Sequence, residues 1–183
     1  MPLITVEHPA GQLSPTQKAV LAEDLTRILL EIEGGGDTAF GRSGSWVRFR
    51  EFQPGDWFVG GVNDGTHVSA SGLFLVDVVV PEGLLDQPNM SRAHQAVNDA
   101  IAHVTGADAG DTRSVWIQIH EWPEGSLASA GRTVSLFGIA RLAGHPAEHP
   151  VLQHPRAYFD AKVRVYEAHD FPATTAGRVL NTY

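Results

Sequence analysis

The sequence predicts an α/β fold of the α+β kind, in which tandem β-α-β units form a four-stranded mixed sheet with two helices on one face. Two observations predict it: an internal repeat at an offset of 70 residues, and a well-marked helix between two apolar strands in the first copy. The 183 residues suffice for one compact domain or for two small halves packed together.

The repeat rests on three separated segments that share one spacing. Residues 46–52, WVRFREF, match residues 116–122, WIQIHEW, and both segments lead into proline and glycine. Residues 3–7, LITVE, match residues 73–77, LFLVD. The glycine pair at 60–61 matches Ala and Gly at 130–131. A single offset for all three segments indicates that one supersecondary unit has been duplicated.

Each unit carries a helix signal between its two strands. In the first unit, Ser14 provides an N-cap, Pro15 the first helical residue and Gln17 a capping-box partner, and the glycines at 34–36 end the helix. Apolar residues recur between them at helical spacing: Val20, Leu21, Leu25, Ile28, Leu29 and Ile32. Residues 91–105 form a weaker helix in the second unit. The pattern of each unit therefore predicts two parallel strands connected by a crossover helix.

The remaining segments predict short edge strands and a less regular end. We expect residues 57–61 and 133–137 to be extra strands that pair with a neighbouring subunit, and residues 158–167 to be a final strand with a period-two pattern. The domain is then residues 1–143, built from units at 2–66 and 72–140, and residues 144–183 form a C-terminal arm. Because the second face of the sheet lacks predicted cover, we expect an oligomer.

Composition limits the possible partners and chemistry. The net charge is -8, with 21 acidic and 13 basic residues, which disfavours a nucleic-acid partner. No apolar run reaches the roughly 20 residues that a membrane helix needs, and the first residues do not form a signal peptide, so we expect a cytoplasmic protein without a membrane partner. Without cysteine, the candidate reactive groups are imidazoles, carboxylates, hydroxyls, lysines and the terminal amine.

Several of these segments together resemble the tautomerase superfamily. They are the Met-Pro start before an apolar strand, the Ser-Pro-capped helix, and the segments at 47–51 and 57–61. The two-unit arrangement is similar to the fused branch that forms trimers, which includes cis-3-chloroacrylic acid dehalogenase, malonate semialdehyde decarboxylase and macrophage migration inhibitory factor. The resemblance covers residues 2–140 and implies a homotrimer that needs no cofactor.

The resemblance implies that Pro2 is catalytic, as a free secondary amine exposed when Met1 is removed. A terminal α-amine titrates near about 7.7–8.0, and burial beside a cation lowers its pKa further, which leaves an uncharged base at neutral pH. Such a base can move a proton between carbon and oxygen in keto–enol tautomerisation. Gly72 stands at the matching position of the second unit, within the chain, so we expect one site per chain.

The same resemblance implies that five further residues bind the substrate. Arg48 stands where single-unit tautomerases bind the substrate, and Arg50 shares its strand face. Trp57 stands where the family places an aromatic wall beside the amine. Gln118 stands where the dehalogenases carry a tyrosine, and His120 lies on the same face. The alternatives are interface or solvated positions for the polar residues and ordinary core packing for Trp57.

Four positions depart from the dehalogenase pattern. Leu29 replaces a helix histidine, Val80 and Gly83 replace a pair of arginines, and Ser129 stands near the position of the catalytic carboxylate. These departures favour simple proton transfer over dehalogenation. The three His-Pro pairs at 145, 149 and 154 do not predict a metal site, because proline after each histidine disfavours a common helical face.

Three hypotheses about function remain. The first is a tautomerase or isomerase that acts on a small 2-oxo or enol carboxylate, with Pro2 as base and Arg48 as carboxylate clamp. The second is a lyase or hydratase in which Pro2 stays protonated as an acid, while Glu121, as a possible acid/base residue, or Glu124 activates water. The third is a trimeric binding protein without enzymatic activity.

Overall fold

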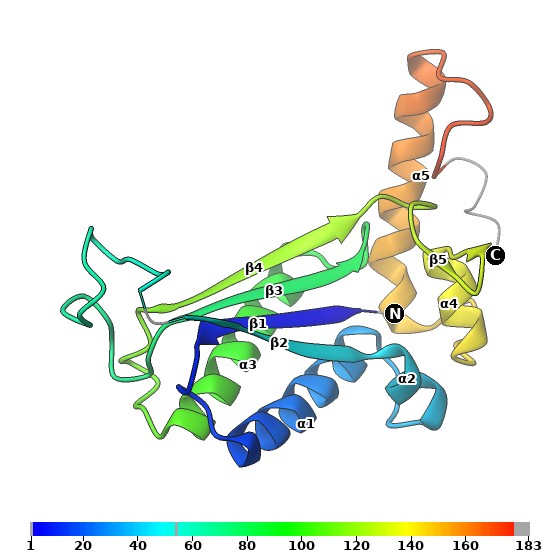
Figure 1. Cartoon of the computed structure of the whole chain (residues 1–183). Coiled ribbons are helices and arrows are strands. Elements are labelled where there is room, and N and C mark those ends of the chain that lie inside the picture. The colour runs from blue at the N-terminus through cyan, green and yellow to red at the C-terminus, as the bar shows by residue number, and fades with distance from the viewer. Residues whose placement is uncertain (1, 54, 178–183) are drawn as a thin grey trace.

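The centre of the fold is a four-stranded sheet in the strand order β2-β1-β3-β4 (Figure 1). The computed structural model describes residues 2–53 and 55–177. The strands are β1 (Leu3–Pro9), β2 (Trp46–Phe52), β3 (Phe74–Pro81) and β4 (Val115–Trp122). β1 runs parallel to β2 and β3 parallel to β4, whereas β1 and β3 are antiparallel. The predicted mixed sheet of two β-α-β units is therefore confirmed.

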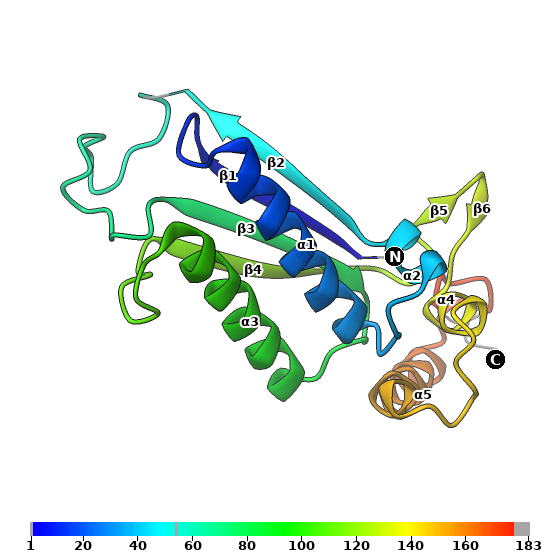
Figure 2. The ribbon, with the colours of Figure 1, turned by 90° about the horizontal axis from the view of Figure 1, so that it is seen from below.

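Two long helices cover one face of this sheet. α1 (Pro15–Ile32) and α3 (Gln87–Thr105) lie side by side along the strands (Figure 2). The predicted capping box is present at Ser14 and Gln17, and the N-cap of α3 is Asp86. Among the described residues, no helix is both long and apolar enough to cross a membrane.

The core fills the space between the helices and the sheet. Alternate residues of the two central strands, β1 and β3, face the helices, which leave them nearly inaccessible to solvent. The largest contributions come from Ile4, Val6, Phe74, Val76, Val78, Val80, Leu21, Leu25, Leu29, Val97 and Ile101. The opposite face has little cover in the described part of the chain, and there Trp46 is 61% exposed and Trp116 is 68% exposed.

Shorter elements gather at the end of the sheet where β1 begins and where β3 and β4 end (Figures 1 and 2). α2 (Ala39–Gly44) precedes β2, and the hairpin of β5 (Ala128–Ser129) and β6 (Arg132–Thr133) follows β4. The chain ends with α4 (Leu136–Leu142), the 3₁₀ turn η1 (Pro150–Leu152) and α5 (Gln153–Ala168).

The predicted edge strands are largely wrong. Residues 57–61 form a loop in which Val59 makes one isolated bridge to Val62, because the positive φ angles of Gly60 and Gly61 turn the chain back on itself. Of residues 133–137, only Thr133 lies in a strand. Leu136 and Phe137 begin α4, which the side chain of Ser135 caps.

The predicted final strand at 158–167 is also wrong, because these residues belong to α5. The residues that face the protein are spaced three or four apart: Pro155, Phe159, Lys162 and Tyr166. Val163 and Val165, which produced the alternating pattern, are half-buried and exposed respectively. Burial of a helical stripe thus outweighed the local β propensity of the two valines.

His8 is a titratable group inside the core. It is 0% exposed, its Nδ1 donates to the carbonyl oxygen of Pro9 at 2.8 Å, and the rings of Phe49 and Phe74 pack beside it. Within residues 2–53 and 55–177, no hydrogen-bond partner reaches its buried Nε2 atom. Burial lowers the pKa of His8 and outweighs the hydrogen bond to Pro9, which raises it; the smaller effects of the charges on Lys18 and Glu51 oppose each other.

We predict that His8 makes the protein less stable in mild acid. Below about pH 6.5 the unfolded chain binds a proton that the buried imidazole resists. The contribution of neutral His8 to the free energy of unfolding is therefore fully present above that pH and is lost as the pH decreases. Urea unfolding between pH 7.5 and 5 measures this loss. His8→Leu flattens the slope, whereas His169→Leu, at an exposed position, preserves it. Equal slopes for the two variants would refute the prediction.

Candidate functional site

Pro2 lies at the amino end of β1, next to the ends of β3 and β4. It is buried, and its carbonyl oxygen accepts a hydrogen bond from the backbone N–H of Trp46 at 3.2 Å. The register pairs Leu3 with Val79, which places Pro2 beside the last residues of β3. Met1 lies outside the described residues, and so does the prediction that it is removed.

A network centred on Glu82 lies at this same end of the sheet. Its Oε1 accepts hydrogen bonds from the Tyr158 hydroxyl at 2.7 Å and from Lys162 Nζ, while its Oε2 accepts from the backbone N–H of Glu124 at 3.0 Å. Burial alone would raise the pKa of Glu82, but these donors together outweigh it and the pKa is lowered. Glu82 is therefore an ionised anchor that attaches α5 to the end of β3.

Glu121 and Glu124 extend this network. Glu121 Oε1 accepts from the backbone N–H of Gly83 at 3.0 Å, and burial raises the pKa of Glu121. Glu124 is only 2% exposed, and both its oxygens accept from the N–H of Leu136 at 3.1 and 3.2 Å. Burial raises the pKa of Glu124 as well. The register pairs Val80 with Glu121, so Glu121 and Pro2 lie at the same end of the sheet, on either side of β3.

The residues that depart from the dehalogenase pattern have structural roles here. Leu29 and Val80 are both 0% exposed and belong to the core. Gly83 has a φ of 71°, and a Cβ atom built there would lie 2.4 Å from Cδ1 of the Tyr158 ring. The C-terminal arm thus requires glycine at this position and occupies the space that a larger side chain would need.

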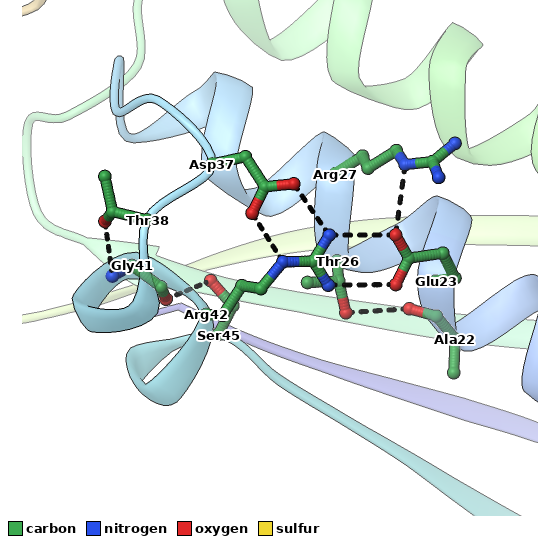
Figure 3. Close-up of polar contacts among 9 residues, drawn as sticks. All are labelled: Ala22, Glu23, Thr26, Arg27, Asp37, Thr38, Gly41, Arg42 and Ser45. Carbon is green, nitrogen blue, oxygen red and sulfur yellow. Dashed lines mark hydrogen bonds and ion pairs between the residues drawn. The ribbon is translucent and has the colours of Figure 1, made fainter.

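A second set of charges fixes α2 to α1 beside this end of the sheet (Figure 3). Arg42 of α2 donates to both carboxylate oxygens of Glu23 of α1, at 3.0 and 2.9 Å. It also donates to Asp37, with one distance of 2.7 Å. The Thr38 hydroxyl caps α2 by accepting from the N–H of Gly41 at 3.0 Å. A small crevice of about 50 Å³ lies between α2, α4 and the end of α1.

A large groove lies at the other end of the sheet. It is a groove of about 920 Å³ between the loop after β2, the residues before β4 and the face of the sheet away from the helices. Its lining includes Phe52, Trp57, Phe58, Arg113, Trp116 and Gln118, with Glu7, Asp56 and His67. The groove therefore brings together two predicted site residues, Trp57 and Gln118.

Three other predicted site residues lie on the open face of the sheet, outside the groove lining. Arg48 Nε donates to the hydroxyl of Thr5 at 2.8 Å. Arg50 pairs with Glu7 at 3.0 Å, and the equivalent pair of the second repeat is His120 with Asp77, at 3.1 Å. The duplication thus preserved a pair of side chains on neighbouring strands in each half.

One chain does not assemble all the predicted residues around one point. Pro2 and Glu121 lie at one end of the sheet, whereas Trp57 and Gln118 line the groove at the other end. Glu7, which lines the groove, lies five positions along the extended strand from Pro2, a distance of about 17 Å. A small carboxylate therefore cannot contact both Pro2 and the Glu7 end of the groove in the same chain.

Sequence reasoning missed Glu82, Tyr158, Lys162 and Arg113. Tyr158 and Lys162 are four residues apart and share a face only in a helix, so a strand prediction for this segment concealed their pairing. Arg113 lies just before β4 and has Ser43 at the equivalent position of the first unit, so the repeat gave no signal for it.

Metal ligands do not gather in the described part of the chain, where no group of three or more His, Cys, Asp or Glu side chains has a suitable arrangement. Two of the three histidines that precede prolines, His145 and His149, stack on each other with ring centroids 4.2 Å apart. The third, His154, packs beside Tyr158.

Comparison with known proteins identifies the fold. No family model matches the sequence, and no curated protein matches it. Among solved structures, native fused 4-OT has 21% identity and a TM-score of 0.58, covering 78% of this chain and 99% of its own. N1, a member of the cis-3-chloroacrylic acid dehalogenase family, has 16% identity and a TM-score of 0.59, covering 92% and 99%. Macrophage migration inhibitory factor from Toxoplasma gondii has 14% identity and a TM-score of 0.54, covering 72% and 99%.

The first two proteins belong to the tautomerase superfamily, and other structures of fused 4-OT are described as symmetric and asymmetric trimers. At these identities the likeness concerns the fold, and this chain has the tautomerase-superfamily fold. The fold predicted from the sequence is confirmed.

We predict that the Glu82 network holds α5 in place. Lys162→Met leaves the half-buried Glu82 carboxylate without its cation, which costs about 1–3 kcal/mol of unfolding free energy. It also accelerates amide hydrogen exchange in α5, measured by mass spectrometry. Arg164→Met, at an exposed position of the same helix, is the matched control. Identical exchange in the two variants would show that the network does not hold the helix.

Proposed function

We propose that this chain is a cofactor-independent enzyme of the tautomerase superfamily, an isomerase that uses Pro2 as a general base on a small 2-oxo or enol carboxylate. The observation that carries the proposal is the buried position of Pro2 at the start of β1 on this fold. The relatives in fold are tautomerase-superfamily enzymes, which supports an enzymatic role. A cytoplasmic location stays a prediction from the sequence.

The proposed reaction needs only proton transfer. With Met1 removed, Pro2 carries a secondary amine, and burial disfavours its charged form and so lowers its pKa. The neutral amine takes a proton from the hydroxyl of the enol substrate, the electrons form the carbonyl, and the protonated amine delivers a proton to carbon. The substrate carboxylate keeps its charge throughout and needs a cation that holds it in position.

We further propose that the working site forms between copies in a homotrimer. Pro2 and the Glu7 end of the groove lie about 17 Å apart in one chain, so a small substrate contacts both only if different copies supply them. The two exposed tryptophans, Trp46 and Trp116, mark the open face of the sheet as a surface that needs cover. A head-to-tail interface that closes a ring brings the amino end of one copy to the groove of the next. The trimers described for fused 4-OT support this arrangement.

A lyase or hydratase activity is the second candidate. The observation that favours it is the pair of carboxyls with raised pKa, Glu121 and Glu124, at the same end of the sheet as Pro2. In that mechanism Pro2 stays protonated. Titration of Pro2 by nitrogen-15 NMR separates the two: a neutral amine well below pH 7 supports the isomerase and excludes the lyase.

We predict that Pro2→Ala reduces enol ketonisation at least about 100-fold, because the substitution replaces the secondary amine that acts as the base. The measurement is the ultraviolet absorbance of an enol carboxylate over time, on protein whose intact mass shows that Met1 is absent. Unchanged turnover would refute the role of Pro2. If the wild-type protein is a folded trimer but converts none of the enols tested, the hypothesis of a binding protein without enzymatic activity is favoured instead.

A mixing experiment tests the shared site. Pro2→Ala and the double variant Trp57→Ala/Gln118→Ala are each inactive alone, but co-expression produces trimers in which an intact Pro2 meets an intact groove. With random assembly, about one quarter of the sites combine both, so about one quarter of wild-type activity returns. If each chain holds a complete site, no activity returns.

A further inference from the structure

The groove at the end of the sheet away from Pro2 has the size and the wall residues of a small-molecule site. Its volume of about 920 Å³ lies within the range of ligand pockets, about 300–1,000 Å³. Phe52, Trp57, Phe58 and Trp116 give it aromatic walls. The rings of Phe52 and Trp57 meet edge to face, with centroids 5.2 Å apart. These walls fit a ligand with an apolar or aromatic body.

Reciprocal hydrogen bonds hold the loop that forms one side of the groove. The N–H of Ser69 donates to the Ser114 hydroxyl at 2.9 Å, and the N–H of Ser114 donates to the Ser69 hydroxyl at 3.1 Å. Both serines are buried. The N–H of Ala70 also donates to Asp111 at 3.3 Å. The end of this loop and the segment that carries Arg113 are therefore joined before any ligand binds, which reduces the entropy lost on binding.

Arg113 is the arginine of the groove lining. Its side chain is 81% exposed, and its contact with Asp111 is long, at 3.8 Å. Arg48 and Arg50, the arginines expected from the sequence, do not line the groove, and their side chains bind Thr5 and Glu7. Of the three guanidinium groups, that of Arg113 is thus the one placed to bind a ligand in the groove.

The acidic residues of the lining lie toward the other edge of the sheet. Glu7 is in β1 and pairs with Arg50, and Asp56 lies in the loop after β2. Arg113 precedes β4, and β2 and β4 are the two edge strands. Adjacent strands are about 4.8 Å apart, so these two edge strands lie about 14 Å apart across the sheet. A ligand carboxylate would therefore be attracted to the β4 side of the groove.

We propose that the groove binds a carboxylate with an apolar or aromatic body, and that Arg113, rather than Arg48, clamps the carboxylate. The guanidinium forms paired hydrogen bonds to the two carboxylate oxygens, and the ligand body lies against Trp57 and Trp116. The Gln118 amide donates to a carbonyl or hydroxyl oxygen of the ligand. This inference rests on the proposed function for one point only, that the ligand bound in the groove is the molecule on which Pro2 of a neighbouring copy acts.

The test is binding of 3-phenylpropanoate to the intact protein, measured by titration calorimetry and by the change in intrinsic tryptophan fluorescence. We expect Arg113→Gln to weaken binding about ten- to a hundredfold, because the ligand loses a charge-assisted pair. Arg113→Lys retains part of the affinity, since lysine keeps the positive charge but lacks the paired N–H donors of the guanidinium. Arg132→Gln removes the same charge from exposed β6 and leaves binding unchanged.

The uncharged analogue 3-phenylpropan-1-ol should bind as weakly to wild type as the acid binds to Arg113→Gln. Equal affinity of acid and alcohol, equal loss in Arg113→Gln and Arg132→Gln, or no binding to wild type would each overturn the inference. Pro2→Ala separates it from the proposed function. If this variant keeps its turnover while Arg113→Gln loses binding, the proposed function fails and the Arg113 clamp stands.

Discussion

The antiparallel pairing of β1 with β3 is the interaction on which the rest of the molecule depends. It joins the two parallel β-α-β units into one sheet and puts the amino end of β1 beside the ends of β3 and β4. The same pairing brings the end of β1 to the start of β4, where the groove lies. The two ends of the sheet therefore carry different groups: Pro2, Glu82, Glu121 and Glu124 lie at one, and Trp57, Trp116 and Arg113 lie at the other.

The C-terminal arm closes the Pro2 end from outside the duplicated units. Glu82 accepts hydrogen bonds from Tyr158 and Lys162 of α5 and from the backbone N–H of Glu124. One carboxylate therefore connects the end of β3, the segment between β4 and β5, and the arm. The ring of Tyr158 requires Gly83. An arginine at position 83, as in the dehalogenase pattern, is incompatible with this arm, so the altered residues and the arm form one structural solution.

The duplicated units give one candidate site because they differ at the position of Pro2. Gly72 stands at the position equivalent to Pro2, in mid-chain. Gln12 closes that position by binding both backbone groups of Leu73, at 3.0 and 3.1 Å, and a Cβ atom at Gly72 would lie 2.6 Å from its side chain. Gln12 thus has a structural role at this position. On the open face, by contrast, the units retain equivalent pairs, Arg50 with Glu7 and His120 with Asp77.

The sequence by itself determined the sheet, its two helices and the position of Pro2, because these follow from local signals: strand periodicity, the Ser14 capping box and a repeat of fixed offset. Tertiary structure decided the arm, the groove and the place of Arg113. A period-two pattern at 158–167 is compatible with strand or helix until burial of Phe159 against the core selects the helix. The groove lies between residues of two segments, 52–75 and 113–118. The hydrogen bonds between Ser69 and Ser114 connect these segments, and no periodic pattern in the sequence predicts them. Contacts between distant segments depend on how surfaces pack, and packing has no signature in a single sequence.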